Sequence, residues 1–179
     1  MVLWAVRHTL AERKQIMSRN IYIHKFDPEA EEGMGAFPLE DVRTALKGIG
    51  DPFYKEWGVE EDGDGGIETG EQIPYTSPDG RSAFASSTDT FLFTVVNGQV
   101  KALDWDRPLG REGTVRALWY LIEALRLSLI DPSGGGDEPM LYVTSEAVLE
   151  EVEQVWPECR EMGVHIFDGY VDFRTRFES

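Results

Sequence analysis

The residues most suited to binding chemistry are six carboxylates that lie among glycines between positions 60 and 71. Carboxylate oxygens are ligands that Ca²⁺ prefers, and glycine lets a loop turn sharply enough to bring several of them onto one ion. The same residue types on a surface would instead present negative charge to a basic partner. The six acids are Glu60, Glu61, Asp62, Asp64, Glu68 and Glu71.

The spacing within this run resembles the twelve-residue calcium loop of an EF-hand, and the resemblance covers these twelve residues only. Gly65 falls at the sixth position, where the motif has its glycine, and Glu71 falls at the twelfth, where the motif has its bidentate acid. The resemblance implies a Ca²⁺ site whose ligands are Asp62, Asp64, Glu68 and Glu71.

Two features of the sequence depart from a complete EF-hand. The first loop position holds Glu60 where the motif has Asp, and Pro74 with the turn-prone residues 77–80 interrupts the helix that should follow. The alternative interpretation of residues 60–71 is an acidic, glycine-rich surface turn.

A second group of carboxylates flanks Trp105, at the end of a predicted strand. Side chains two positions apart on a strand lie on the same side, so Asp104 and Asp106 could act as a carboxylate pair. The alternatives are two solvated charges at a strand end, or an acidic surface with an aromatic residue that contacts a partner.

Other residues that often perform catalysis are isolated. His8, His24 and His165 lack the spacing of a transition-metal site, and Cys159 has acidic neighbours that should raise its pKa. The glycines at 134–136 match no phosphate-binding motif. We therefore expect neither an enzyme nor a bound cofactor, although a small enzyme with a carboxylate-based site remains an alternative.

Charge restricts the partners of the chain. Its 179 residues contain 33 acidic and 17 basic residues, a net charge of −16. Residues 1–26 hold five basic and one acidic residue, so the acidic excess lies in the rest of the chain. This field repels nucleic acid and anionic membranes and attracts basic proteins. A lone cysteine and the lack of a long apolar run predict a cytoplasmic protein.

Hydrophobic patterning predicts an α+β fold, a mainly antiparallel sheet built from hairpins with two to three helices packed on it. We expect an N-terminal helical extension over 1–19 and a single domain over 20–179. Residues 51–90 read as irregular, with possible short strands. The predicted strands are 21–26, 91–96, 99–105, 140–143, 164–167 and 170–173, with hairpin turns at Asn97-Gly98 and Asp168-Gly169, and the predicted helices are 39–49, 110–129 and 146–156.

In size, charge and expected architecture the chain resembles the small acidic immunity proteins that neutralise bacterial polymorphic or contact-dependent toxins. The resemblance covers most of residues 20–175 and includes no diagnostic motif. It implies an inhibitor whose acidic surface covers a basic toxin domain. The expected contacts with that partner are Glu60, Glu61, Asp62, Asp64, Glu68, Glu71, Asp104, Trp105 and Asp106, and helix 146–156 offers an alternative acidic surface.

Overall fold

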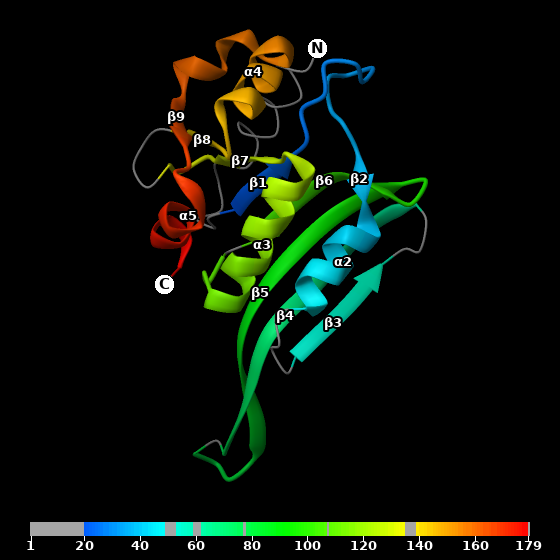
Figure 1. Cartoon of the computed structure of the whole chain (residues 1–179). Helices are drawn as coiled ribbons and strands as arrows, with labels where there is room; N and C mark the ends of the chain where they lie inside the picture. Colours follow the sequence, from blue (N-terminus) through cyan, green and yellow to red (C-terminus); the bar gives the residue numbers. More distant parts are fainter. Residues whose placement is uncertain are drawn as a thin grey trace.

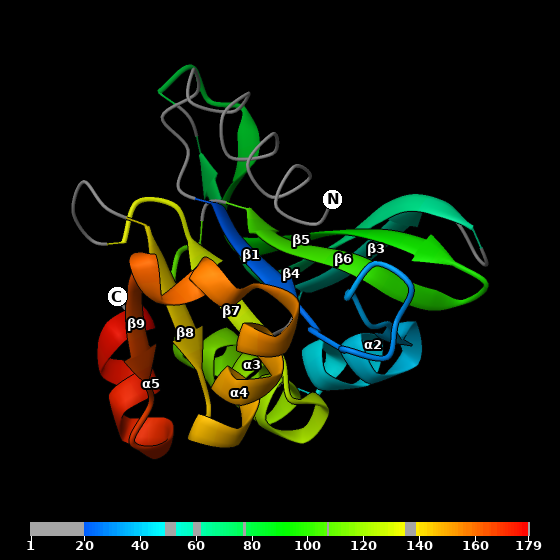
Figure 2. The ribbon, with the colours of Figure 1, turned by 90° about the horizontal axis from the view of Figure 1, so that it is seen from above.

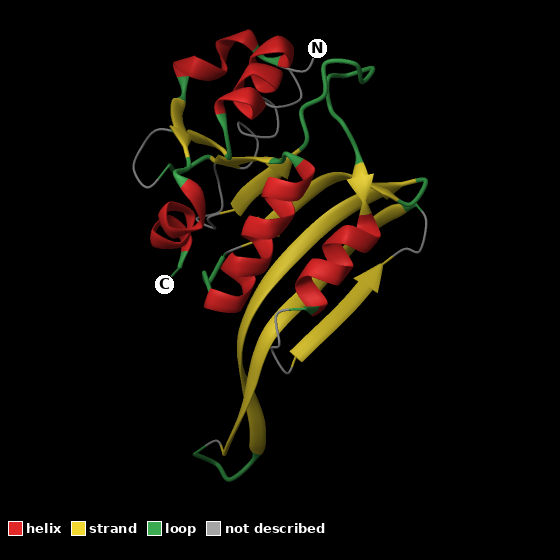
Figure 3. Ribbon diagram, viewed as in Figure 1, coloured by secondary structure: helices red, strands yellow, loops and turns green. Residues whose placement is uncertain are grey.

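A computed structural model describes residues 20–48, 53–58, 62–76, 78–106, 108–134 and 139–178. Figure 1 shows its strands and helices, and Figure 3 colours the same view by secondary structure. The strands are β1 (Asn20–His24), β2 (Phe37–Pro38), β3 (Phe53–Gly58), β4 (Gly63–Thr76), β5 (Ser82–Val96), β6 (Gln99–Asp106), β7 (Ser128–Asp131), β8 (Met140–Val143) and β9 (Gly163–Ile166). The helices are α2 (Leu39–Lys47), α3 (Glu112–Leu125), α4 (Glu146–Val155) and α5 (Gly169–Phe177), and a 3₁₀ helix, η1, covers Pro157–Glu161.

The strands form one mixed, mostly antiparallel sheet in the order β3-β4-β5-β6-β1-β7-β8-β9, with β2 added beside β6. The β8–β9 pair is parallel, and the other pairs are antiparallel. The predicted α+β class with a mainly antiparallel sheet is confirmed, and in the described residues four helices pack against it. None of these helices is long and apolar enough to cross a membrane.

Two apolar clusters lie on opposite faces of the sheet. The larger cluster joins α2, α3 and α5 to residues such as Ile23, Phe91 and Trp105. The smaller cluster joins α4 to β1, β7 and β8 through residues such as Tyr22 and Leu141. Figure 2 shows α2 and α3 on one side of β4, β5 and β6. Within the described residues, the smaller cluster contains no residue from β3 to β6, so α4 leaves the outer side of these strands uncovered.

The Asn97-Gly98 hairpin is present as predicted. Asn97 and Gly98 have φ angles of 52° and 70°, as a type I′ turn requires, and they join β5 to β6. Ser145 caps α4, because its side chain accepts a hydrogen bond of 3.3 Å from the Val148 amide.

The prediction that residues 51–90 are mainly irregular is wrong, although strand does form where short strands were allowed for, at Ile67 and at 73–75. Residues 51–90 contain β3, β4 and much of β5, and β4 and β5 pair without interruption from Gly63 with Val95 to Thr76 with Ser82. Beyond Gly70, neither β3 nor β6 extends alongside, so the ribbon projects from the body of the protein (Figure 1). Pairing of each strand with its neighbour in the sheet overrides the low strand propensity of Gly, Asp and Ser here.

Two predicted boundaries near the C-terminus also need correction. The helix predicted over 110–129 ends at Leu125, where Arg126 has a φ of 55°, and Ser128–Asp131 form β7 instead. The second predicted hairpin is absent, because β9 pairs in parallel with β8 and residues 170–173 belong to α5. The helical extension predicted over 1–19 lies outside the described residues.

Candidate functional site

The side of β3–β6 that faces away from α2 and α3 is the candidate site, and we call it the open face. Strand alternation puts one half of the side chains of these strands there, and the buried half contacts the helices. The open face consists of Lys55 and Trp57 of β3, Asp64, Gly66 and Glu68 of β4, Thr90, Leu92 and Thr94 of β5, and Ala102, Asp104 and Asp106 of β6.

The register of the strands brings the two predicted acidic groups onto this face. Glu68 pairs with Thr90, and Thr90 pairs with Asp106 on the next strand. One step along the strands, Gly66 pairs with Leu92, and Leu92 pairs with Asp104. Acids that are about 40 positions apart in the sequence therefore lie two strands apart, a separation of about 10 Å.

Neutral groups hold several of these acids in place. Asp64 Oδ1 accepts a hydrogen bond of 2.7 Å from Thr94 Oγ1, and Glu68 Oε1 accepts one of 2.7 Å from Thr88 Oγ1. Asp62 accepts one of 2.7 Å from the Asn97 amide. Hydrogen bonds from hydroxyls and amides orient a carboxylate and leave its negative charge in place.

A hollow of about 450 Å³ lies on the open face and contains both acidic and apolar walls. Trp57, Asp64, Leu92 and Asp104 are among its lining residues. Trp57 is 41% exposed and Leu92 is 36% exposed, so both apolar side chains are accessible on this face. Trp57 and Leu92 were not among the predicted contacts, although the alternation of residues 53–58 would have placed Trp57 and Lys55 on one side of a strand.

On the other acidic surface, on α4, arginines of the chain pair with several of the acids. Arg160 pairs with both Glu146 and Glu153, and Arg126 pairs with Glu151 at 2.8 Å. These ion pairs cancel much of the charge on α4.

Trp105 does not belong to the open face, and its prediction as a contact residue is wrong. Its side chain is fully buried on the helix side of the sheet and stacks against Phe91 with ring centroids 5.8 Å apart. The physical reason is strand alternation, since Asp104 and Asp106 occupy the opposite side. The expected placement of these two acids on one side is confirmed.

The calcium loop predicted over 60–71 does not form in the described residues. Gly63–Thr76 are extended strand, which puts about 13 Å between the Cα atoms of Asp64 and Glu68. Glu71 lies an odd number of residues from both acids along the strand, so its side chain points to the other side of the sheet. No group of three metal-ligating side chains suited to an ion occurs in the described ranges, and Glu60 and Glu61 lie outside them.

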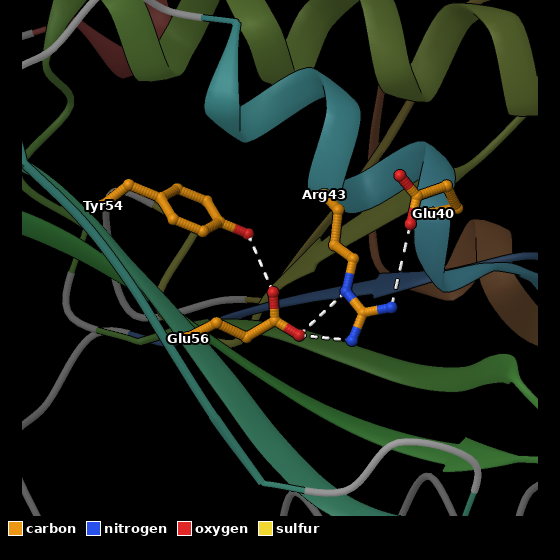
Figure 4. Close-up of polar contacts among 4 residues, drawn as sticks. All are labelled: Glu40, Arg43, Tyr54 and Glu56. Atoms are coloured by element: carbon orange, nitrogen blue, oxygen red, sulfur yellow. Dashed lines mark hydrogen bonds and ion pairs between the residues drawn. The ribbon is translucent and has the colours of Figure 1, made fainter.

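A polar network fixes β3 to α2, and it was not predicted (Figure 4). Arg43 Nε donates a hydrogen bond of 2.8 Å to Glu56 Oε1, and the Tyr54 hydroxyl donates one of 3.1 Å to Glu56 Oε2. Arg43 also lies 3.7 Å from Glu40. The hydrogen bonds from Arg43 lower the pKa of Glu56. Because Tyr54 and Glu56 alternate with Lys55 and Trp57, this network holds the strand that presents Trp57 to the open face.

The remaining candidates for chemistry have structural surroundings. Cys159 is buried, and burial together with the nearby Glu153 raises the pKa of its thiol, as expected for an unreactive cysteine. His165 Nε2 lies 2.7 Å from Asp172 Oδ2, and this contact joins β9 to α5. His24 lies between the rings of Tyr22 and Phe26 on β1 and the segment after it.

Comparisons with models of known protein families, with curated protein sequences and with solved structures found no match to this chain.

Proposed function

We propose that this chain is a binding protein whose open face covers a basic protein partner. The observation that carries the proposal is the alignment of Asp64, Glu68, Asp104 and Asp106 on one sheet face, beside two exposed apolar side chains. A cluster of negative charges attracts a basic partner and raises the rate of association. Exposed aromatic residues supply affinity once contact is made.

The class of partner follows from the resemblance to immunity proteins. We propose that the partner is a bacterial toxin domain with a basic substrate-binding cleft, such as a nuclease, and that the complex forms in the cytoplasm. Binding would block the cleft without any chemical step, so the proposal requires neither an enzyme activity nor a cofactor of this chain.

The test compares two variants that each remove four negative charges. The face variant combines Asp64→Asn, Glu68→Gln, Asp104→Asn and Asp106→Asn. The control variant combines Glu31→Gln, Glu32→Gln, Glu150→Gln and Glu158→Gln, four exposed acids that lie away from the open face. Each purified protein is immobilised and exposed to extract from the native cells, and the retained proteins are identified and purified.

The proposal expects a basic protein that the wild type and the control variant retain and the face variant loses. With that protein purified, the association rate of the face variant at low salt should fall about tenfold, while the control changes it much less. Co-expression in a bacterial host should show that the partner alone arrests growth and that the wild type restores it. Equal retention by both variants would place the interface elsewhere, and a partner that is harmless alone would exclude the immunity role.

A further inference from the structure

The hollow on the open face has three chemically different walls. Trp57 supplies an aromatic wall, Leu92 an aliphatic one, and Asp64 and Asp104 supply carboxylates. Its volume of about 450 Å³ falls within the range of ligand pockets in proteins. A side chain that combines an apolar stem with a flat cationic head would satisfy all three walls at once.

Gly66 gives the aromatic wall its position. A Cβ atom at Gly66 would lie 2.3 Å from Trp57 Cζ2 and 2.7 Å from Trp57 Cε2, so the indole lies directly over the glycine backbone. Trp57 and Gly66 are cross-strand partners, and Leu92 is the next residue in the same row. The missing side chain at Gly66 therefore lets the indole lie over β4, toward the hollow.

We propose that this hollow seats one arginine side chain of the partner, with its guanidinium stacked on Trp57 and paired with the carboxylates of Asp64 and Asp104. The inference rests on the proposed function and adds which side chain of the partner binds in the hollow. Arginine fits better than lysine because a planar guanidinium stacks on an indole and carries five N–H donors, enough to reach two separate carboxylates at once. Thr94 already orients Asp64 by bonding Oδ1, and Oδ2 is the oxygen that we assign to the guanidinium.

The first experiment titrates the full chain with two capped pentapeptides, Gly-Gly-Arg-Gly-Gly and its lysine analogue, while NMR follows the indole N–H resonances. Trp105, Trp119 and Trp156 are buried and serve as internal references. The arginine peptide should shift the Trp57 resonance saturably, at millimolar concentrations, and bind at least threefold more tightly than the lysine peptide. A Trp57 resonance that does not move, or that responds equally to both peptides, would overturn the inference.

The second experiment separates the anchor from the charged face, with a dodecapeptide of alternating arginine and glycine as the probe. Trp57→Leu and Gly66→Ala should each weaken binding about three- to tenfold and leave its salt dependence unchanged, since neither alters a charge. Trp57→Phe should retain part of the affinity because phenylalanine keeps an aromatic face. The face variant defined above should weaken binding and flatten the salt dependence.

These results distinguish the two proposals. If the face variant weakens binding and the Trp57 and Gly66 variants do not, the proposed arginine site in the hollow is wrong, and the proposal that the open face binds a basic partner stands. If the face variant binds the dodecapeptide as well as the charge-matched control variant does, both proposals fail. Unfolding by urea, followed for each variant, confirms that the compared proteins are folded.

Discussion

The indole nitrogen of Trp105 donates a hydrogen bond of 3.0 Å to Asp89 Oδ1, on the side of the sheet that the helices cover. The backbone amide of Leu109 donates a second bond of 2.7 Å to the same oxygen. Asp89 and Trp105 are both fully buried. One carboxylate thus joins β5, β6 and the segment that leads into α3, and Trp105 is a core residue although both of its neighbours in sequence lie on the open face.

Replacing Asp89 should therefore destabilise the protein strongly. Asp89→Ala removes the acceptor of two N–H groups, and we expect the free energy of unfolding to fall by about 2–4 kcal/mol. Asp89→Asn keeps a carbonyl oxygen in the same place and should cost less than half as much. Urea denaturation followed by fluorescence measures both values. A loss below about 0.5 kcal/mol for Asp89→Ala would show that the indole and the amide find other acceptors.

Local patterns were the predictable part of this fold. Asn97 and Gly98 adopt positive φ readily, so their hairpin follows from two adjacent residues. Ser145 signals the start of α4 because it can bond the amide three residues later. By contrast, Asp168-Gly169 is an equally good turn sequence, yet it begins α5, since β9 finds its partner in the distant β8 and needs no hairpin.

Residue contacts between paired strands could not be read from composition. Gly65 and Gly66 look like loop residues in sequence, but each makes room for a ring, Phe93 on one side of the sheet and Trp57 on the other. For the site, the shared side of Asp104 and Asp106 followed from alternation alone. The position of Glu68 relative to Asp106 could not be predicted without knowing that β5 lies between their strands. The role of Trp57 could not be predicted without knowing that it pairs with Gly66.

The pair of Arg43 and Glu56 should make stability depend on pH. Arg43 lowers the pKa of Glu56, so the native state binds fewer protons than the unfolded state near the usual glutamate pKa of about 4.5. The contribution of this pair to the free energy of unfolding is present above that pH, and it is lost as the pH falls through the lowered native pKa of Glu56. A double-mutant cycle with Arg43→Ala and Glu56→Ala should give a coupling of about 1 kcal/mol at pH 7 and less at pH 3. A coupling near zero at pH 7 would mean that solvent screens the pair.

Gly33 and Gly98 provide a matched comparison of backbone strain with and without a clash. Both have a φ of +70°, but a Cβ at Gly33 would lie 2.3 Å from Val155 Cγ1 of α4, whereas no described atom lies within 4 Å of the position at Gly98. Gly98→Ala should cost about 1 kcal/mol from strain alone. Gly33→Ala should cost about 2–4 kcal/mol because it also overpacks the contact with α4. Equal losses in urea denaturation would show that α4 shifts freely.

His24 should reduce stability in mild acid. Its ring centroid lies 6.4 Å from that of Tyr22 and 6.2 Å from that of Phe26, and burial lowers its pKa from 6.5 to about 4. Between these pH values the unfolded chain binds the proton and the native chain does not, so stability falls as pH falls. The loss between pH 7 and pH 5 should be about 2 kcal/mol.

The variant His24→Gln isolates this effect from the other titrating groups. Its free energy of unfolding, measured in urea at pH 7, 6 and 5, should fall by about 2 kcal/mol less than that of the wild type, because all other titratable groups are the same in both proteins. An NMR titration of the wild type should show that the His24 imidazole stays neutral down to about pH 4. If the two proteins lose stability in parallel, or if His24 titrates near pH 6.5, then water reaches the ring between Tyr22 and Phe26, and this end of β1 is more open than its packing indicates.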